Sequence, residues 1–271
     1  MPHAPSAGQL VLLCIAIGLF TIGGVLSMLR LRWDRPALRI AAKACAYSGI
    51  TIGVGVLCWH SADRGSWLPL DDNFDALIWL ALLLAGFVMY VQRTRPVGGL
   101  DWFIMPIVIA MLIGALALGS ARPHAYLTTA WSWVHRVFAY GGAIAFAVAG
   151  AVGAMYLIVN HRLRSKHALA GPNFGSLERL ERLTLESVSL GFALLTIGAI
   201  MGFIEISRGK ETSHVKVALA LCVWVVYAIV LHAPINPRFR GRRAAVLSVI
   251  GFVLMIGTLL AALLVPSGGH S

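Results

Sequence analysis

The segment VHRVFAYGGAIAFAVAGAVGAMYLIV (residues 134–159) is apolar almost from end to end, apart from His135 and Arg136 at its start. A helix of about 20 such residues crosses the hydrocarbon core of a bilayer, so this segment predicts a transmembrane helix. Seven similar runs flank it, at residues 9–28, 37–59, 74–91, 102–119, 185–206, 215–231 and 244–265. The chain is therefore predicted to be an all-α integral membrane protein, a bundle of about eight transmembrane helices.

The composition indicates the same class of protein. Apolar residues make up 59% of the 271 residues and charged residues only 12%, whereas soluble domains carry about 25% charged residues. The net charge of +11 does not indicate nucleic acid binding, because the basic residues form short clusters between the apolar runs. We expect a single polytopic membrane domain over residues 1–271, surrounded by the lipid bilayer and without a nucleic acid partner.

Charge alternates between the connections that join the predicted helices. Arginine follows the first, third, fifth and seventh runs, as at Arg30, Arg93, Arg162 and Arg238. The connection after the second run carries mainly aspartates: Asp63, Asp71, Asp72 and Asp75. Because cytoplasmic connections are enriched in lysine and arginine, both termini are predicted to lie outside. We expect the last three aspartates to shape an outer loop, with Asp72 or Asn73 capping the next helix.

Two further segments carry structural signals. The run at 134–159 is rich in small residues, which let helices approach closely in lipid and predict a tightly packed helix. These residues are Gly141, Gly142, Ala145, Ala149, Gly150 and Gly153. The segment SLERLERL (residues 176–183) has helical spacing and mixed charge. We expect it to lie at the cytoplasmic interface or to extend the next helix inward.

Several histidines lie at the ends of predicted helices. His60, His135 and His214 are at predicted outer ends, and His270 follows the last helix on the same side, whereas His232 ends its helix on the cytoplasmic side. Imidazole exchanges protons near neutral pH and is the usual axial ligand of haem iron. A single such histidine can equally be an interfacial side chain, but two from different helices could hold one iron from opposite sides.

Several motifs in the chain resemble those of one known family. They are WLPLDDNFDAL (67–77), WSWVH (131–135), GFALLTIG (191–198), VWVVYAIVLH (223–232), RGRR (240–243) and SVIGF (248–252). Together they are similar to the cytochrome c assembly family of the CcsA, HemX and YpjD type. The resemblance covers roughly residues 59–271, so it leaves out the first helix and most of the second.

The resemblance implies a cofactor site at the outer membrane face. In CcsA-like proteins the histidine of a Trp-x-x-x-His motif and a histidine after the last helix ligate haem, and these positions match His135 and His270. A histidine ending a motif like that at 223–232 is linked to a second, membrane-embedded haem, which matches His232. The implied cofactor is non-covalent haem b, with His135 and His270 as the axial ligands of its iron.

Other polar residues near the predicted outer face are further candidates for the same site. Lys216 and Arg136 are expected either to pair with haem propionates or to snorkel at the interface. His60 and His214 lie on the same predicted side and are candidate cofactor-binding residues. Glu205 is an acid close to the end of an apolar run, where a functional role and an interfacial role are both open.

The connection at 208–216 departs from the pattern of the haem-handling members, which carry a tryptophan-rich loop there, whereas this chain reads RGKETSHVK. Two functions are therefore open. The first is a role in cytochrome c maturation, with haem held at the outer face for delivery to a partner such as a CcsB-like membrane protein. The second is a HemX- or YpjD-like structural or regulatory protein that has no haem and acts through a partner. In either case we expect an accessory protein rather than an enzyme, in the inner (cytoplasmic) membrane of a bacterium.

Overall fold

A computed structural model describes residues 5–33, 35–65, 72–94, 96–118, 130–164, 176–209, 213–232 and 241–264. All regular structure in these ranges is α-helical. The helices are α1 (Ala7–Arg32), α2 (Pro36–Arg64), α3 (Asn73–Thr94), α4 (Leu100–Leu118), α5 (Ala130–Arg164), α6 (Leu177–Ser207), α7 (His214–Leu231) and α8 (Arg242–Leu264). All eight are long and apolar enough to cross a membrane. The prediction of an all-α membrane protein with about eight spanning helices is confirmed.

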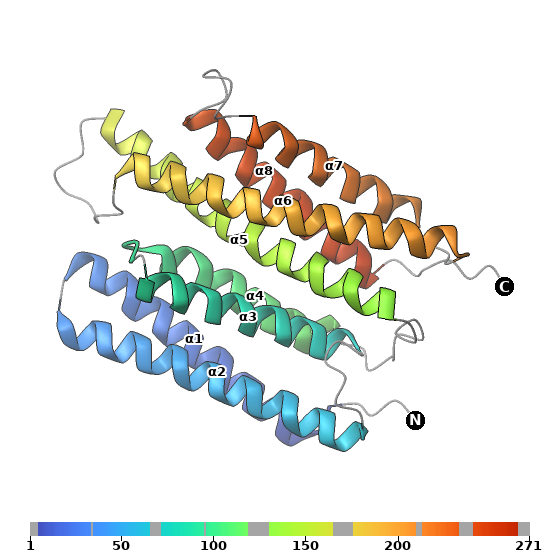
Figure 1. Cartoon of the computed structure of the whole chain (residues 1–271). Coiled ribbons are helices and arrows are strands. Elements are labelled where there is room, and N and C mark those ends of the chain that lie inside the picture. The colour runs from blue at the N-terminus through green and yellow to red at the C-terminus, as the bar shows by residue number, and fades with distance from the viewer. Residues whose placement is uncertain are drawn as a thin grey trace. The chain divides into compact units, whose positions relative to one another are not determined.

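The described helices divide into two compact units, the first with α1 to α4 and the second with α5 to α8. In the first unit, α1 and α3 each pack against both α2 and α4. In the second unit, α5 and α7 each pack against both α6 and α8. Each unit is thus a four-helix bundle in which consecutive helices run in opposite directions, as Figure 1 shows. The expectation of one membrane domain over the whole chain stays a prediction.

Capping side chains set the ends of several helices. Ser6 accepts a hydrogen bond from the Gln9 backbone N–H, and the Gln9 side chain accepts one from the Ser6 N–H, so α1 begins with a capping box. Gly65 ends α2 in the left-handed conformation, with φ of 66°. Ser176 caps α6 through the Arg179 N–H. Of the two alternatives for the segment at 176–183, the structure shows the extension of α6.

Glycines on α5 bring its backbone close to the neighbouring helices of the second unit. A Cβ atom added at Gly142 would lie 3.3 Å from the Gly191 carbonyl oxygen of α6. One added at Gly153 would lie 2.9 Å from the Ala245 carbonyl oxygen of α8. Helices associate in lipid largely through such close backbone contacts. The predicted tight packing of this helix is confirmed.

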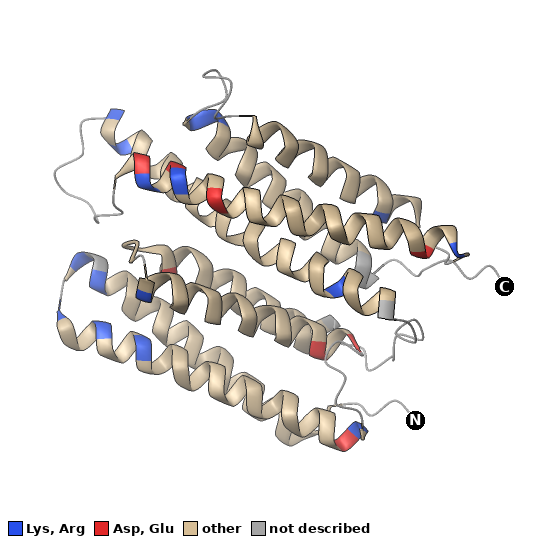
Figure 2. Cartoon of the chain, viewed as in Figure 1, with Lys and Arg blue, Asp and Glu red and all other residues tan. Residues whose placement is uncertain are grey.

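Lysine and arginine collect at one end of each bundle, as Figure 2 shows. In the first unit they gather where α1 ends and α2 begins, and in the second where α5 ends and α6 and α8 begin. These are the ends that the charge of the connections assigns to the cytoplasm. The orientation of the chain in a membrane, with both termini outside, stays a prediction.

Candidate functional site

His135 lies in the second turn of α5 and faces α6 of the same unit. Its Nδ1 atom is 2.6 Å from the backbone carbonyl oxygen of Gly198. A carbonyl oxygen only accepts hydrogen bonds, so Nδ1 carries a proton and donates it, and in the neutral imidazole Nε2 then keeps its lone pair. A histidine whose one ring nitrogen is held by a backbone carbonyl is oriented to present the other nitrogen to a metal. The imidazole is therefore held in the tautomer that an axial ligand needs.

Two glycines on α6 make room for this imidazole. Gly198 and Gly202 are one helical turn apart on the face that meets α5. A Cβ atom at Gly202 would lie 3.0 Å from Cε1 of His135, and a Cβ at Gly198 would lie 3.3 Å from the backbone nitrogen of Ala139. Any larger residue at either position would push against the imidazole or its helix. The ring position of His135 thus depends on the absence of side chains at these two positions of α6.

A buried polar contact joins α5 and α6 beside His135. The Ser132 hydroxyl, one turn before His135, donates a hydrogen bond to the Glu205 carboxylate of α6. Both side chains are buried, with exposed fractions of 4% and 8%. Next to them, the Arg208 guanidinium lies 5.1 Å from the centre of the Trp131 ring, a distance at which a cation attracts an aromatic face. Glu205 is therefore part of the buried structure around His135.

The other predicted residues of the second unit fall at its two ends. Arg136 follows His135 and is half-buried, while His214 is the exposed first residue of α7 and Lys216 is half-buried in its first turn. Because α7 runs antiparallel to α6, its start lies at the end of the bundle where α5 begins. His232 follows the last residue of α7 and lies at the opposite end, as expected. His270 lies outside the described residues.

His232 is exposed, and its ring is tied to its own helix. Its Nδ1 atom is 2.8 Å from the Ala228 carbonyl oxygen, one turn earlier. As in His135, this contact places a proton on Nδ1, and in the neutral ring it leaves the Nε2 lone pair available. The two histidines that the resemblance assigned to different haems therefore share a tautomer, and they lie at opposite ends of one bundle.

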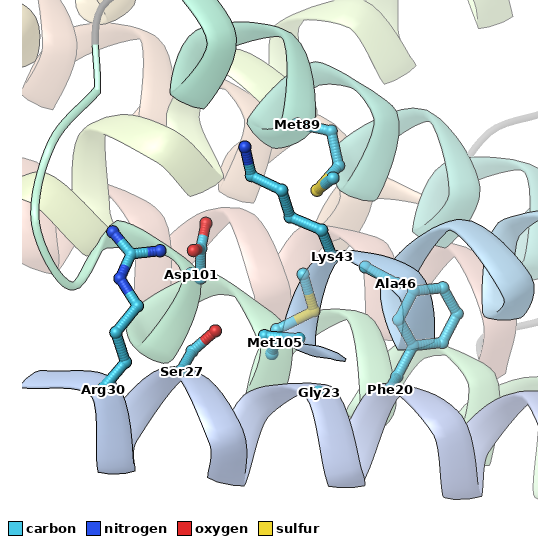
Figure 3. A pocket seen from close by; sticks show the side chains of 10 residues that line it. Phe20, Gly23, Ser27, Arg30, Lys43, Ala46, Met89, Asp101 and Met105 are labelled. Atoms are coloured by element: carbon cyan, nitrogen blue, oxygen red, sulfur yellow. The ribbon is translucent and has the colours of Figure 1, made fainter. Parts of the chain in front are cut away.

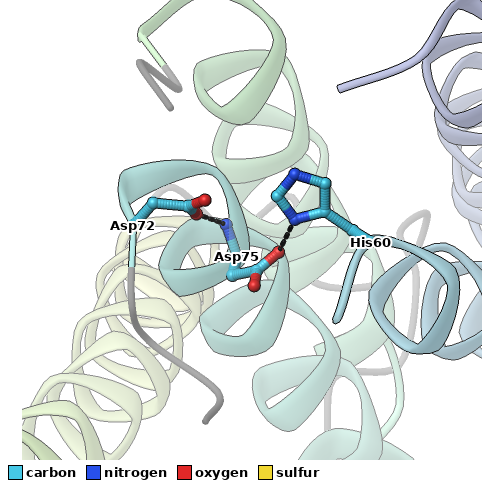
Figure 4. Close-up of side chains that lie close together, drawn as sticks. All are labelled: His60, Asp72 and Asp75. Carbon is cyan, nitrogen blue, oxygen red and sulfur yellow. Dashed lines mark hydrogen bonds and ion pairs between the residues drawn. The ribbon is translucent and has the colours of Figure 1, made fainter. Parts of the chain in front are cut away.

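The first unit contains a buried ionic network that the sequence did not predict. His60, near the end of α2, is 1% exposed, and its Nδ1 lies 2.9 Å from the Oδ1 atom of Asp75, which is fully buried in the first turn of α3. Arg64 pairs with the other oxygen of Asp75 and reaches Asp72 at 3.4 Å. The Phe74 and His60 rings pack at a steep angle to each other, with 5.1 Å between ring centres. Figure 4 shows His60, Asp72 and Asp75 around the start of α3.

Asp72 connects this network to the backbone. One of its carboxylate oxygens accepts a hydrogen bond of 2.8 Å from the Asp75 N–H, so Asp72 caps α3, one of the two alternatives predicted. Burial raises the pKa of the Asp72 carboxyl above its ordinary value, and this hydrogen bond and the nearby Arg64 oppose that change. Asp75 does not shape an outer loop as expected, and Asp71 lies outside the described residues. Asp75 is the buried acceptor for both His60 and Arg64.

The arrangement of this network favours an ion-pair cluster over a metal site. Ligand atoms of His60, Asp72 and Asp75 lie within 4.8 Å of one another, a spacing that a divalent cation could bridge. The Arg64 guanidinium, however, already contacts both carboxylates, and its positive charge would repel a cation there. In the sequence, the only sign of this network is the group of aspartates around a single arginine in the connection after α2. The sequence does not show which of these aspartates is buried.

No solved structure matches this chain. Among known proteins, it is 24% identical to a cytochrome c biogenesis protein CcsA of Guillardia theta, over 77% of each chain. It is 26% identical to the inner membrane protein YpjD of Escherichia coli strain K12, over 82% of this chain and 83% of that protein. A CcsA of Thermosynechococcus vestitus is 37% identical, but over only 35% of this chain and 30% of that protein.

The family model described as Cytochrome C assembly protein matches residues 67–268. This range contains His135 and His232, Glu205 and the network residues Asp72 and Asp75, and it agrees with the extent of the motifs in the sequence. The match covers most of the chain, and the similarity to CcsA and YpjD proteins is consistent with it. The chain therefore belongs to the Cytochrome C assembly protein family.

Proposed function

We propose that this protein holds haem b non-covalently at the outer membrane face during cytochrome c maturation and delivers it to a partner. The observation that carries the proposal is the geometry of His135, whose Nδ1 donates to the Gly198 carbonyl, so that the neutral ring keeps its lone pair on Nε2. Family membership supports a role in cytochrome c maturation, because similar proteins are named cytochrome c biogenesis protein CcsA. His135 and His270 would be the axial ligands.

The residues around His135 have properties that suit a haem site. When bound, haem supplies an iron whose axial positions accept imidazole nitrogen. The Gly198 carbonyl sets the direction of the His135 ring, and the glycine at 202 leaves the space that the ring occupies. Arg136 and Lys216, half-buried near the same end of the unit, carry the charge that attracts carboxylates such as propionates. His214, at the same end of the unit, is exposed, and the proposal gives it no part in holding the haem.

Two further features belong to the proposal. His232, at the opposite end of the unit, would bind a second haem through Nε2, since its Nδ1 is engaged by Ala228. His60 is enclosed by its network and would support the first unit instead of reaching a haem iron. We place the protein in a bacterial inner membrane, as the YpjD relative is named, and expect a CcsB-like membrane protein to receive the haem.

A second candidate function is favoured by one observation. The connection at 208–216 contains no tryptophan, so it offers no flat aromatic surface for the haem macrocycle. In this alternative the protein keeps the fold without haem and acts through a partner, in the manner of a structural or regulatory HemX- or YpjD-like protein. Bound haem distinguishes the two functions.

The test is a reduced-minus-oxidised optical spectrum of the protein purified in detergent after expression with ample haem. We expect a Soret band and sharp reduced bands in the wild type and their loss in His135→Ala, because one axial ligand is removed. His214→Ala is the matched control, an exposed imidazole at the same end of the unit, and is expected to keep the bands. A wild-type protein without bands would favour the alternative, and loss in His214→Ala alone would overturn the assignment to His135.

A milder substitution tests whether α6 positions the imidazole. In Gly202→Ala the new Cβ would lie 3.0 Å from Cε1 of His135, so the ring has to rotate or shift. We expect about tenfold weaker haem retention, from an off-rotamer cost of about 1.4 kcal/mol, while the protein stays folded. Haem titration of the apoprotein measures this change. Gly257→Ala on α8, where no described atom lies within 4 Å of the new Cβ, should bind haem as the wild type does.

A further inference from the structure

Acids packed between the helices of the first unit have cations beside them in the same bundle. Arg64 pairs with the buried Asp75. At the other end of the unit, Arg30 and Lys43 line the same small cavity as Asp101, as Figure 3 shows. Opposite charges at such short range attract each other strongly where water is excluded. These acids therefore serve the packing of the first unit.

The second unit has a buried acid, Glu205, on the helix face that receives the His135 ring. Gly198, Gly202 and Glu205 follow one another at spacings of four and three residues, so they share one face of α6. This face meets α5, which runs in the opposite direction. Gly202 lies against the His135 ring, and Glu205 accepts a hydrogen bond from Ser132. Glu205 thus lies about 4.5 Å along the helix axis beyond the glycine that receives the imidazole.

The free nitrogen of His135 is directed away from the inner member of this face. Nδ1 contacts the Gly198 carbonyl, and Nε2 lies on the other side of Cε1, so it points away from Gly198. Nε2 is still beside α6, because a Cβ atom added at Gly202 would lie 3.8 Å from it. Glu205 is the outer member of the same face. A metal on Nε2 would therefore have this carboxylate about one helical turn from its ligand.

The surroundings of Glu205 suit a negative charge that water screens little. The Ser132 hydroxyl donates to the carboxylate, and the Arg208 guanidinium lies beside Trp131 at the end of α6. A hydroxyl donor and a nearby cation both favour the carboxylate anion. The residue is only 8% exposed, so its field acts over a longer range than that of a surface charge. Ferric iron carries one more positive charge than ferrous iron, and a nearby anion therefore stabilises the ferric state.

We propose that Glu205 lowers the reduction potential of a haem bound at His135, and so makes the site prefer ferric over ferrous haem. Glu205 acts through its charge and does not ligate the iron. The inference rests on the proposed function, because it needs haem on His135, and it adds a preference for one oxidation state. One buried charge at this separation corresponds to about a tenfold preference, which is about 59 mV for a one-electron couple.

The test is a redox titration of the haem-loaded full chain in detergent, followed through its optical bands. Glu205→Gln keeps the side-chain volume and an oxygen that accepts from Ser132, but it removes the charge. We expect it to raise the midpoint potential by about 59 mV, a tenfold change. Glu205→Asp retains the charge and should stay close to the wild-type value. Glu178→Gln removes an exposed acid at the opposite end of α6 and is the control, with an unchanged potential.

Ser132→Ala separates the effect of charge from that of packing. It removes the hydrogen bond between α5 and α6 and leaves the carboxylate in place, so it should shift the potential less than Glu205→Gln does. A purely structural role predicts the reverse, because glutamine still accepts from Ser132 whereas alanine cannot donate. The affinity of the apoprotein for haem in each oxidation state is a second measurement. Glu205→Gln should weaken ferric binding about tenfold more than ferrous binding, the same factor as in the potential.

The outcomes distinguish this inference from the proposed function. An unchanged or lower potential in Glu205→Gln, or an equal rise in Ser132→Ala or Glu178→Gln, would overturn the role of Glu205 and leave haem binding at His135 intact. A wild-type protein without haem bands would overturn the proposed function, and the inference with it.

Discussion

Asp75→Ala is expected to destabilise the protein by about 3–5 kcal/mol, the cost of removing one partner from a buried ion pair. Asp75 is fully buried and accepts from both His60 and Arg64. Without it, the Arg64 guanidinium retains Asp72 at the longer distance of 3.4 Å, and Nδ1 of His60 loses its acceptor. The other ring nitrogen of His60 cannot compensate, because Nε2 is buried without a hydrogen-bond partner among the described residues. Unfolding of the purified protein in detergent, followed by circular dichroism, measures the loss.

A nearby aspartate is the control for this substitution. Asp63 lies on α2 one residue before Arg64, is exposed, and accepts one hydrogen bond of 2.8 Å from Gln9. Asp63→Ala should therefore cost about 1 kcal/mol. The double variant Arg64→Ala with Asp75→Ala should lose less stability than the sum of the two single variants, because it leaves fewer buried charges unpaired. Equal stabilities of Asp75→Ala and Asp63→Ala would contradict the buried network.

Gly153→Ala is expected to lower the stability of the second unit by about 1–3 kcal/mol through overpacking. Its Cβ would lie 2.9 Å from the backbone carbonyl oxygen of Ala245. A backbone atom cannot rotate away as a side chain can, so α5 and α8 have to separate. One turn earlier, a Cβ added at Gly150 would lie 2.6 Å from the Cβ of Phe252 on α8. The unfolding temperature in detergent is the measurement.

The control substitution, Gly257→Ala, is expected to change the unfolding temperature in the opposite direction to Gly153→Ala. At Gly257 on α8, an added Cβ meets no described atom within 4 Å. Alanine stabilises a helix interior relative to glycine by up to about 1 kcal/mol, so Gly257→Ala should raise the unfolding temperature slightly. If Gly153→Ala raised it as well, the close approach of α5 and α8 would be refuted.

The number and class of the helices could be predicted from the sequence, but their full lengths could not. The apolar run at 185–206 lies inside α6, which begins at Leu177, and the run at 134–159 lies inside α5, which extends from Ala130 to Arg164. An apolar run marks the part of a helix that lipid can surround. The backbone hydrogen bonds continue beyond it until a cap such as Ser176 ends them.

The candidate site was predictable only in part, because local motifs identify residues but not their contacts with other helices. The motifs identified His135 and His232 as candidates. The alternation of charge between the connections predicted that they lie at opposite membrane faces. The sequence did not show that Nδ1 of His135 meets the Gly198 carbonyl, which lies 63 residues further along the chain. It also placed Asp75 in a loop, because an aspartate beside other aspartates is usually solvated. Only packing of α2 against α3 makes Asp75 a buried acceptor.

The sequence by itself determined that this is an eight-helix membrane protein of the cytochrome c assembly family, since apolar run length and local motifs are properties of contiguous residues. The tertiary structure decided which helices form each four-helix bundle, which tautomer His135 adopts, and which acids are buried. These features depend on contacts between helices. In lipid, such contacts follow from the fit of small residues and buried polar groups, because apolar surface alone does not favour one helix neighbour over another.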